Sequence, residues 1–297
     1  MANNNVAPEQ FADFIQGLRA IMSNIIKLSS PETHEYWEIP VLYEDENLLA
    51  LNKPACLLSC PDRYDPDRPN LMRLLHDAIK KGSPWSKERH IDYLANAHRL
   101  DFETSGIMLL AKNKPALIAL ANQFGADKPL KTYTALIEGV PLEPVFDVDS
   151  PLSPHTIRLG LMRIDTKNGK KSFTHFETLE RFLDYTLLKC QPRTGRTHQI
   201  RVHLRSIDLP IVADSQYGGR HLLLSKIKPK YHYKGNQSEN PLMGRLALHA
   251  EQLVVRHPVT DAVITITSPL PKDLTVAIKY LRRYASITPP PKIPGAL

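Results

Sequence analysis

The sequence contains few cysteines and few glycines, and each shortage excludes a class of protein. Its three cysteines are too few, and odd in number, for a disulfide framework. Cys56 and Cys60 are four positions apart, but no second Cys/His pair with zinc-like spacing accompanies them, so we expect no metal site. Among the 13 glycines there is neither a G-x-G-x-x-G pattern nor a Walker-type phosphate loop.

Long hydrophobic runs are also missing. No run approaches the roughly 20 apolar residues that a membrane-spanning helix needs. The first ten residues, MANNNVAPEQ, have neither the basic start nor the apolar core of a secretory signal. Hydrophobic residues make up 42% of the chain and charged residues 23%, which is ordinary for a globular protein. We therefore expect a cytoplasmic protein.

Acidic residues are outnumbered by basic ones. The 38 Lys and Arg residues against 31 Asp and Glu residues give a formal net charge of +7. This balance permits a phosphate-rich partner without establishing one, so the location of the charges must decide.

Strands outnumber helices in the hydrophobic pattern, and the two do not alternate regularly. This arrangement favours an α+β fold with a central mixed, mostly antiparallel sheet flanked by helices and loops. We expect helices over 8–28, 71–81, 113–125, 198–207 and 275–284, and strands within 41–53, 107–111, 131–139, 183–190 and 252–267.

The stretch AHRLDFETSGIMLLAK, residues 97–112, places a carboxylate at the entrance to a buried strand. Asp101 could simply cap a local N–H group in a turn. It could instead be a reactive carboxylate at the mouth of a cleft, because an adjacent cation favours the ionised form, and an ionised aspartate can act as a nucleophile or a base.

Arginines gather in the stretch PRTGRTHQIRVHLRSIDLP, residues 192–210. A tight turn at Thr194 and Gly195 precedes the expected helix, so backbone N–H groups lie next to Arg193 and Arg196. Helix N-termini and arginine forks both favour phosphate or carboxylate. A solvated basic helix face is the alternative, but the neighbouring His198 would be an unusual choice for one.

Two other segments combine aromatic and basic residues. Tyr133, in KTYTAL, could be a core aromatic or could stack on a nucleobase. The segment KIKPKYHYK, residues 226–234, interleaves lysines such as Lys228 and Lys230 with Tyr231. It is either a phosphate-binding and stacking surface or a solvated insertion.

Four separated motifs together resemble the RluA family of RNA pseudouridine synthases, which acts on ribosomal and transfer RNA. They agree with the family in type and in order from about Val41 to about Asp273. The motifs are VLYEDENLLALNKPACLLSCP, HRLDFETSG, KTYTALIEG and RTGRTHQIRVHL, the last followed by LPIVADSQYGG and RLALHA. The resemblance implies the pseudouridine synthase fold, with an active-site cleft across the sheet.

The resemblance also implies catalytic roles for three residues. Asp101 would attack either the uracil ring or the anomeric carbon of the ribose. Arg196 would pair with Asp101, keeping it charged and oriented. Tyr133 would stack on the target uracil and help remove the proton from ring carbon 5.

Further residues are implied in RNA binding. Arg99 would enter the space vacated when the nucleotide flips out of its duplex. Arg193 and Arg201 would contact phosphate or fix the site. We add three groups from the basic segments described above: His198, the lysines Lys228 and Lys230, and Tyr231.

The implied reaction breaks a carbon–nitrogen glycosidic bond, rotates the ring and rejoins it through carbon. Because no redox step or hydrolysis occurs, we expect no cofactor and no metal. The expected partner is ribosomal or transfer RNA, and we expect a monomer.

The expected domain organisation departs from that of many relatives, which have a small basic RNA-binding domain first. Here we expect an N-terminal helix and linker over 1–37, a catalytic domain over 38–285 and a proline-rich tail over 286–297. The segment 219–244 is longer than in compact relatives and is a candidate RNA clamp.

Two other functions remain open at this point. The chain could be a non-catalytic RNA-binding protein that retains the fold. It could also be an unrelated hydrolase that uses Asp101 with His98 or His198 as an acid–base partner, although such an enzyme usually needs a second carboxylate or a metal.

Overall fold

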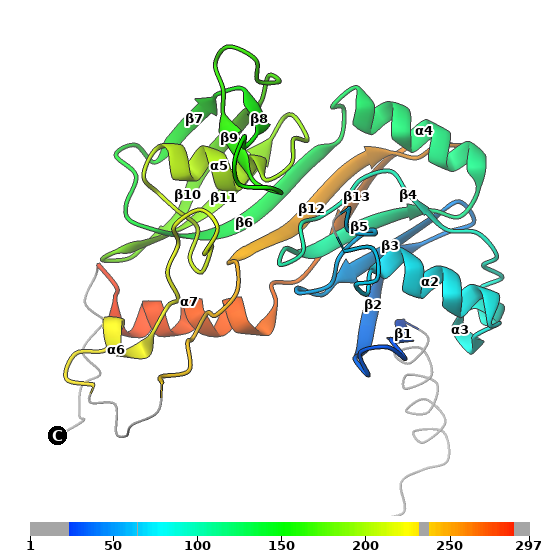
Figure 1. Ribbon diagram of the computed structural model, residues 1–297, viewed down its shortest axis with the longest axis horizontal. Helices are drawn as coiled ribbons and strands as arrows, with labels where there is room; N and C mark the ends of the chain where they lie inside the picture. Colours follow the sequence, from blue (N-terminus) through cyan, green and yellow to red (C-terminus); the bar gives the residue numbers. More distant parts are fainter. Residues whose placement is uncertain (1–23, 64, 232–237, 288–297) are drawn as a thin grey trace, which may run out of the picture.

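The fold is built around one long, curved sheet with helices on its faces (Figure 1). The structure is a computed structural model that describes residues 24–63, 65–231 and 238–287. None of the helices in these ranges has both the length and the hydropathy that a membrane span requires.

The main sheet has eleven strands, in the order β1-β2-β3-β5-β12-β6-β11-β10-β7, with β4 beside β5 and β13 beside β12. Every pairing is antiparallel except that of β5 with β12, so the predicted mixed, mostly antiparallel sheet is confirmed. Strands β8 and β9 form a separate hairpin. The strands are β1 Ile25–Ser29, β2 Tyr36–Glu44, β3 Leu48–Lys53, β4 Ala95–Asn96, β5 Ser105–Ala111, β6 Leu130–Glu138, β7 Val145–Asp149, β8 Leu152–Pro154, β9 Met162–Ile164, β10 Phe173–Arg181, β11 Tyr185–Pro192, β12 Leu248–Arg256 and β13 Val263–Thr267.

Six helices lie within the described residues. Two of them begin at an asparagine whose side chain accepts a backbone N–H: Asn70 accepts from Arg73 and Asn113 from Ala116. The helices are α2 Leu71–Lys80, α3 Pro84–Glu88, α4 Lys114–Gly125, α5 Gln199–Ser206, α6 Leu224–Ile227 and α7 Lys272–Tyr284.

The apolar run of β5 is explained by burial on both faces. Met108 and Leu110 belong to a core that contains side chains of α2. Ile107 and Leu109 point the other way, into a core that contains side chains of α4. A central strand covered on both sides needs apolar residues at every position, and all seven residues of β5 are buried.

Gly106 allows β5 and β12 to approach each other at the start of β5. Its φ is +114°, and an added Cβ would lie 2.2 Å from the carbonyl oxygen of Ala250 on β12. Because only glycine tolerates both conditions, this position fixes the one parallel pairing of the main sheet. The loop of residues 97–104 contains Asp101, and we call it the catalytic-motif loop; it ends where β5 begins.

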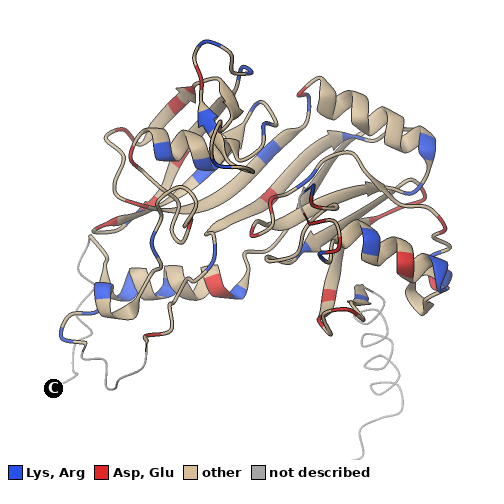
Figure 2. Cartoon of the chain, in the orientation of Figure 1, with Lys and Arg blue, Asp and Glu red and all other residues tan. Residues whose placement is uncertain are grey.

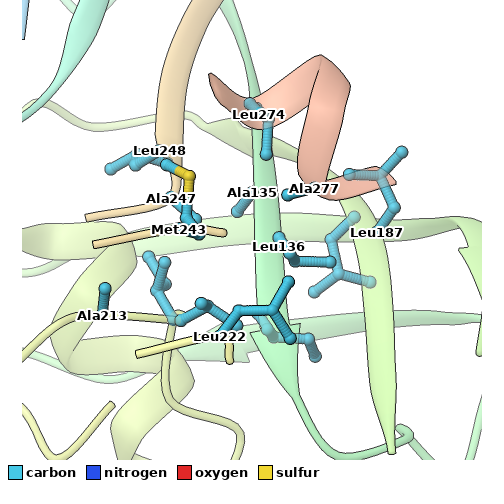
Figure 3. Close-up of a cluster of buried hydrophobic side chains, with 14 of the residues drawn as sticks. Ala135, Leu136, Leu187, Ala213, Leu222, Met243, Ala247, Leu248, Leu274 and Ala277 are labelled. Carbon is cyan, nitrogen blue, oxygen red and sulfur yellow. The ribbon is translucent and has the colours of Figure 1, made fainter. Parts of the chain in front are cut away.

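A third core fills the C-terminal half. Leu274 and Ala277 of α7 pack over the strands β6 and β11, against side chains that include Leu136 and Leu187 (Figure 3). Apolar residues recur along α7 at Leu274, Ile278 and Leu281, one face of a helix, and all are buried. The opposite face of α7 is left for charged residues (Figure 2).

The expected N-terminal organisation needs correction. Of the helix expected over 8–28, residues 8–23 lie outside the described residues, but Ile25 and the four residues after it form β1. β1 pairs with β2, which begins at Tyr36, so the expected boundary between 37 and 38 cuts through a strand. The alternate burial of Ile26 and Leu28 shows a period of two, which outweighs the helical pattern there.

The other expected elements are found with small shifts at their ends. The helix expected from 198 ends at Ser206, so Ile207 lies beyond it and is 40% exposed instead of buried. Strands β7 to β10 were not predicted, because their residues alternate weakly and include many polar side chains.

Candidate active site

A cavity of about 430 Å³ lies beside the neighbouring strands β5, β12 and β6 of the main sheet. Its lining comes from the loop before β5, the end of α4, the strand β6 and the segment that leads into α5. These parts are remote in sequence and meet because β5 and β6 flank β12 in the sheet. The lining includes Arg99, Asp101, Thr104, Phe124, Lys131, Tyr133, Arg196, His198, Arg201 and Leu248.

Asp101 faces Arg201 inside this cavity. The shortest separation is 3.4 Å, between Oδ2 of Asp101 and Nη1 of Arg201. The Asp101 side chain is 18% exposed and that of Arg201 only 4%. The carboxylate therefore reaches the cavity while its cation is almost fully covered, which orients one oxygen toward the arginine and leaves the other available.

Arg201 is itself held by three side chains from the segment after α5. Nε and Nη2 donate to the two oxygens of Asp214 at 2.8 Å each, and Nη2 also donates to Gln216. The guanidinium lies over the ring of Tyr217, 4.8 Å from its centroid. Burial opposes the charge, but the hydrogen bonds and attraction of Asp214 and the nearby Asp101 raise the pKa of Arg201 overall.

His198 lies on the other side of Asp101 as a neutral ring. Burial lowers its pKa, an effect that the charge of Asp101 only partly offsets. The hydroxyl of Tyr217 accepts the N–H of Met162 and lies 2.9 Å from Nδ1 of His198. The other ring nitrogen, Nε2, faces Oδ1 of Asp101 at 3.9 Å.

Tyr133 comes from the middle of β6 and lines the same cavity. Burial, and then the charge of Asp101, raise the pKa of its phenol well above its usual value. The ring is therefore neutral near pH 7. A neutral aromatic ring suits stacking on a base, and its hydroxyl can pass a proton only as a relay, because it does not rest as a phenolate.

The expected pairing of Arg196 with Asp101 is wrong. Arg196 lies at the rim of the cavity, where Nη2 is 3.8 Å from Oδ2 of Asp127 and Nε donates to the carbonyl of Lys171. The turn at Thr194 and Gly195 points Arg196 away from Asp101. Arg201, on the buried face of α5, takes the place that the sequence assigned to Arg196.

The remaining predicted RNA-binding residues are divided between the cavity and the surface. Arg99 is exposed and lines the cavity. Arg193 is exposed but does not line it; its guanidinium lies 5.0 Å from the ring centroid of Phe173. Lys228, Lys230 and Tyr231 lie just after α6 and do not line the cavity.

Two basic side chains, Lys53 and Arg245, hold the backbone of the catalytic-motif loop, although burial lowers the pKa of Lys53 to about 7. Nζ of Lys53, which is fully buried, donates to the carbonyls of Pro54, Leu57 and Phe102. Nη1 of Arg245 donates to the carbonyl of Glu103. The carbonyls of the two residues that follow Asp101 are therefore both fixed.

His98 has a structural part in the same loop. Its Nε2 accepts the N–H of Leu109, and its ring stacks on Phe124 at 4.7 Å. Burial, and then the charge of Lys131, lower the pKa of His98 to about 4. It therefore anchors the loop to β5 as a neutral acceptor and does not touch Asp101.

Several of these groups were missed from the sequence. Asp214, Gln216 and Tyr217 stand in the quoted stretch LPIVADSQYGG but received no role there. A signal was present, because an aspartate directly after the apolar residues Ile211–Ala213 is a candidate for a buried ion pair. Lys53 and Arg245 gave no comparable signal, since their contacts with this loop are to backbone carbonyls.

Comparisons with known proteins agree on one family. The family profile described as RNA pseudouridylate synthase matches residues 47–206. Ribosomal large subunit pseudouridine synthase D of Nitrosomonas europaea is 34% identical over 263 residues, which are 87% of this chain and 71% of that protein. The Bacillus subtilis protein described as uncharacterized RNA pseudouridine synthase YlyB is 32% identical, over 84% of this chain and 75% of that one.

Solved structures show the same fold. The human RNA pseudouridylate synthase domain containing 4 protein aligns with a TM-score of 0.61 at 23% identity, over 91% of this chain and 98% of that one. Human RNA pseudouridylate synthase domain containing 1 aligns with a TM-score of 0.56 at 24% identity, over 78% and 84%.

The fold and the sequence matches define an RNA-modifying isomerase. The chain belongs to the RluA family of RNA pseudouridine synthases, which convert uridine in RNA to pseudouridine. The predicted family and reaction are confirmed. Membership favours neither the non-catalytic RNA-binding protein nor the hydrolase.

Proposed function

We propose that Asp101 is the nucleophile of this isomerisation and that Arg201 holds it in place. The observation behind the proposal is the 3.4 Å contact between Oδ2 of Asp101 and Nη1 of Arg201 inside the cavity. Because Asp214 fixes Arg201 through two hydrogen bonds, the cation cannot swing away when the RNA enters. Asp101 is also the carboxylate that projects into the cavity between His198 and Arg201.

The reaction begins with attack by a carboxylate oxygen of Asp101. The oxygen bonds either to the anomeric carbon of the ribose, which expels uracil through N1, or to ring carbon 6 of uracil. In both routes the N1–C1′ bond breaks, the ring rotates and carbon 5 bonds to C1′. The carboxylate leaves again, carbon 5 loses a proton and N1 gains one, so the atoms and electrons balance without an oxidant or reductant.

Tyr133 is proposed to stack on the flipped uracil and to relay the proton from carbon 5. Its place in the lining of the cavity and its neutral state support stacking. A final acceptor for the proton is then needed, and we assign this role to the Asp101 carboxylate after it leaves the sugar or the ring, because the other carboxylate of the lining, Asp127, pairs with Arg196.

Large-subunit ribosomal RNA is the proposed substrate, because several relatives at 31–35% identity are described as ribosomal large subunit pseudouridine synthases. Arg99 is proposed to fill the gap left by the flipped nucleotide, since it is exposed at the cavity. Arg193, outside the cavity, and His198, in its lining, are also proposed to contact RNA. A cytoplasmic location and a monomer remain predictions.

Pseudouridine mapping on total RNA tests both the activity and the target. Carbodiimide adducts are detected by primer extension in cells that lack the gene and in cells that carry the wild type or Asp101→Asn. We expect one or more sites in large-subunit ribosomal RNA to disappear on deletion and to return only with the wild type. Sites confined to transfer RNA would refute the proposed substrate, and rescue by Asp101→Asn would refute the proposed nucleophile.

A further inference from the structure

A group of basic and aromatic residues on α6 and α7 lies outside the cavity. The cations are Lys226, Lys228 and Lys230 in and after α6, and Lys279 and Arg283 in the second half of α7. Figure 2 shows Lys and Arg along both helices. We call this group the α6–α7 surface. Within the described residues, no ion pair joins any of these five cations to a carboxylate.

Two of the five cations of this surface, Lys228 and Arg283, contact aromatic rings in place of carboxylates. Nζ of Lys228 lies 5.4 Å from the ring centroid of Tyr231 and 5.5 Å from that of Tyr284. The guanidinium of Arg283 lies 5.3 Å from the same Tyr284 ring. A cation over a ring keeps its full charge, so these positive groups are restrained without being neutralised.

The arrangement follows from the helical spacing of α7. Lys279 and Arg283 are four residues apart and therefore lie on one face. Tyr280 and Tyr284 have the same spacing, and their rings are 6.0 Å apart. Arg282 points elsewhere, because it donates to Glu180 of β10. Arg282 thus binds α7 to the sheet, whereas Lys279 and Arg283, on another side of the helix, form no ion pair within the described residues.

The start of α7 is tied to the catalytic-motif loop. Asp273 accepts two hydrogen bonds from Arg245, and Arg245 donates to the carbonyl of Glu103, two residues after Asp101. α7 has 13 residues, which span about 20 Å at 1.5 Å per residue. The basic end of α7 is therefore about 20 Å from its start beside the loop.

We propose that the α6–α7 surface binds the phosphates of the RNA segment that flanks the target uridine. The inference rests on the proposed function, because it assumes that the RNA enters the cavity beside Asp101. Unpaired cations interleaved with aromatic rings are typical of surfaces that follow a nucleic-acid backbone. Restrained lysines also lose less side-chain entropy on binding than free ones.

Salt-dependent RNA binding tests the proposal independently of turnover. The probes are two hairpin RNAs with the same uridine-containing loop, one with a long stem and one with a short stem that cannot reach α6. Filter binding gives the RNA association constant at several salt concentrations for the wild type and for Lys228→Gln/Arg283→Gln. The slope of its logarithm against the logarithm of the salt concentration is then compared. Each lost phosphate contact reduces the slope by about one.

A second variant and a control separate binding from folding. Lys226→Gln/Lys230→Gln changes two exposed side chains that make no hydrogen bond or ion pair within the described residues. Lys272→Gln is the control, because Lys272 is also exposed on α7 but lies at its opposite end. Thermal unfolding of every variant identifies any loss of structure.

We expect both double variants to lower the slope by about two on the long hairpin and to match the wild type on the short one. The proposal would be overturned if both double variants kept the wild-type slope on the long hairpin. It would also be overturned if they lowered the slope equally on the long and the short hairpin. Lost binding to phosphatidylserine vesicles with unchanged RNA binding would also overturn it, because the surface would then serve a membrane. An inactive wild type with the expected slopes would refute the proposed function alone.

Discussion

At the residue scale, the site depends on an arginine that is itself held by an aspartate. Asp214 makes two hydrogen bonds with Arg201 and leaves Nη1 to face Asp101. Lysine could not reproduce this arrangement, because it lacks the planar fork that serves two partners at once. Asp101 is therefore oriented by geometry as well as by charge.

Replacing Arg201 should impair chemistry more than replacing Arg196. Arg201→Lys is expected to lower kcat roughly 100-fold, equivalent to about 2.7 kcal/mol, because Asp101 loses its fixed partner. Arg196→Lys, at the rim, should act mainly on KM. Single-turnover rates and KM on one RNA substrate distinguish the two effects, and equal losses of kcat would contradict the pairing seen here.

Acidification should destabilise the protein through His98. Its pKa is lowered to about 4 in the folded chain, against about 6.5 when unfolded. Between these values the unfolded chain binds the proton and the folded chain does not, so the stabilisation is present above pH 6.5 and is lost as the pH falls toward 4. The expected slope is at most about 1.4 kcal/mol per pH unit.

Urea unfolding from pH 7 to pH 4 measures this slope against the variant His98→Gln. Glutamine keeps an acceptor for the N–H of Leu109 but does not titrate. The difference in unfolding free energy between the two proteins should shrink as the pH falls. A difference that is constant over this range would show that His98 does not titrate as described.

At the element scale, the parallel contact between β5 and β12 positions the catalytic-motif loop. The loop ends where Gly106 allows the two strands to approach. Lys53 and Arg245 then hold the carbonyls of Phe102 and Glu103 from behind. The loop is thus fixed at its end and along its length, which gives Asp101 a defined position.

Gly106→Ala should be strongly destabilising. The new Cβ would meet the Ala250 carbonyl at 2.2 Å, in a backbone conformation that alanine rarely adopts. We expect a loss of more than about 2 kcal/mol in urea unfolding. Gly125→Ala is the matched control, since nothing lies within 4 Å of its Cβ position, and it should change stability by less than about 0.5 kcal/mol. Similar losses in both variants would contradict this account.

Elements with a strong period were predictable from the sequence, and weakly patterned ones were not. The helix α4 has Pro115 in its first turn and apolar residues on one face. The sequence predicted it over 113–125, and the structure has it over 114–125. In β10 the apolar residues Phe173, Phe176 and Leu179 are three positions apart instead of two, so the strand was missed. The pairing of Arg196 failed for another reason: a turn decides where its side chain points, and spacing along a helix does not describe a turn.

At the scale of the whole molecule, one sheet joins three hydrophobic cores. β5 shares side chains with the two N-terminal cores, and β12 links it to β6 and the C-terminal core. The order of the strands could not be derived from the sequence, because pairing between distant strands depends on the complete fold. The site is assembled by that order, since Asp101 and Arg201 come from opposite halves.

A continuous sheet should unfold as one unit. Both tryptophans, Trp37 and Trp85, lie in or against one N-terminal core, so their fluorescence reports on that half, whereas far-UV circular dichroism reports on all strands. The two signals should show the same midpoint in urea. Separate midpoints would mean that the C-terminal half unfolds independently of the N-terminal half.

The central claim is that Asp101 is the carboxylate that reacts. Release of tritium from RNA labelled at carbon 5 of uridine measures the reaction directly, because carbon 5 loses its hydrogen when it bonds to the sugar. Asp127→Asn provides a matched control, since Asp127 also lines the cavity but pairs with Arg196. We predict release by the wild type and by Asp127→Asn and none by Asp101→Asn; release by Asp101→Asn at the wild-type rate would contradict the account.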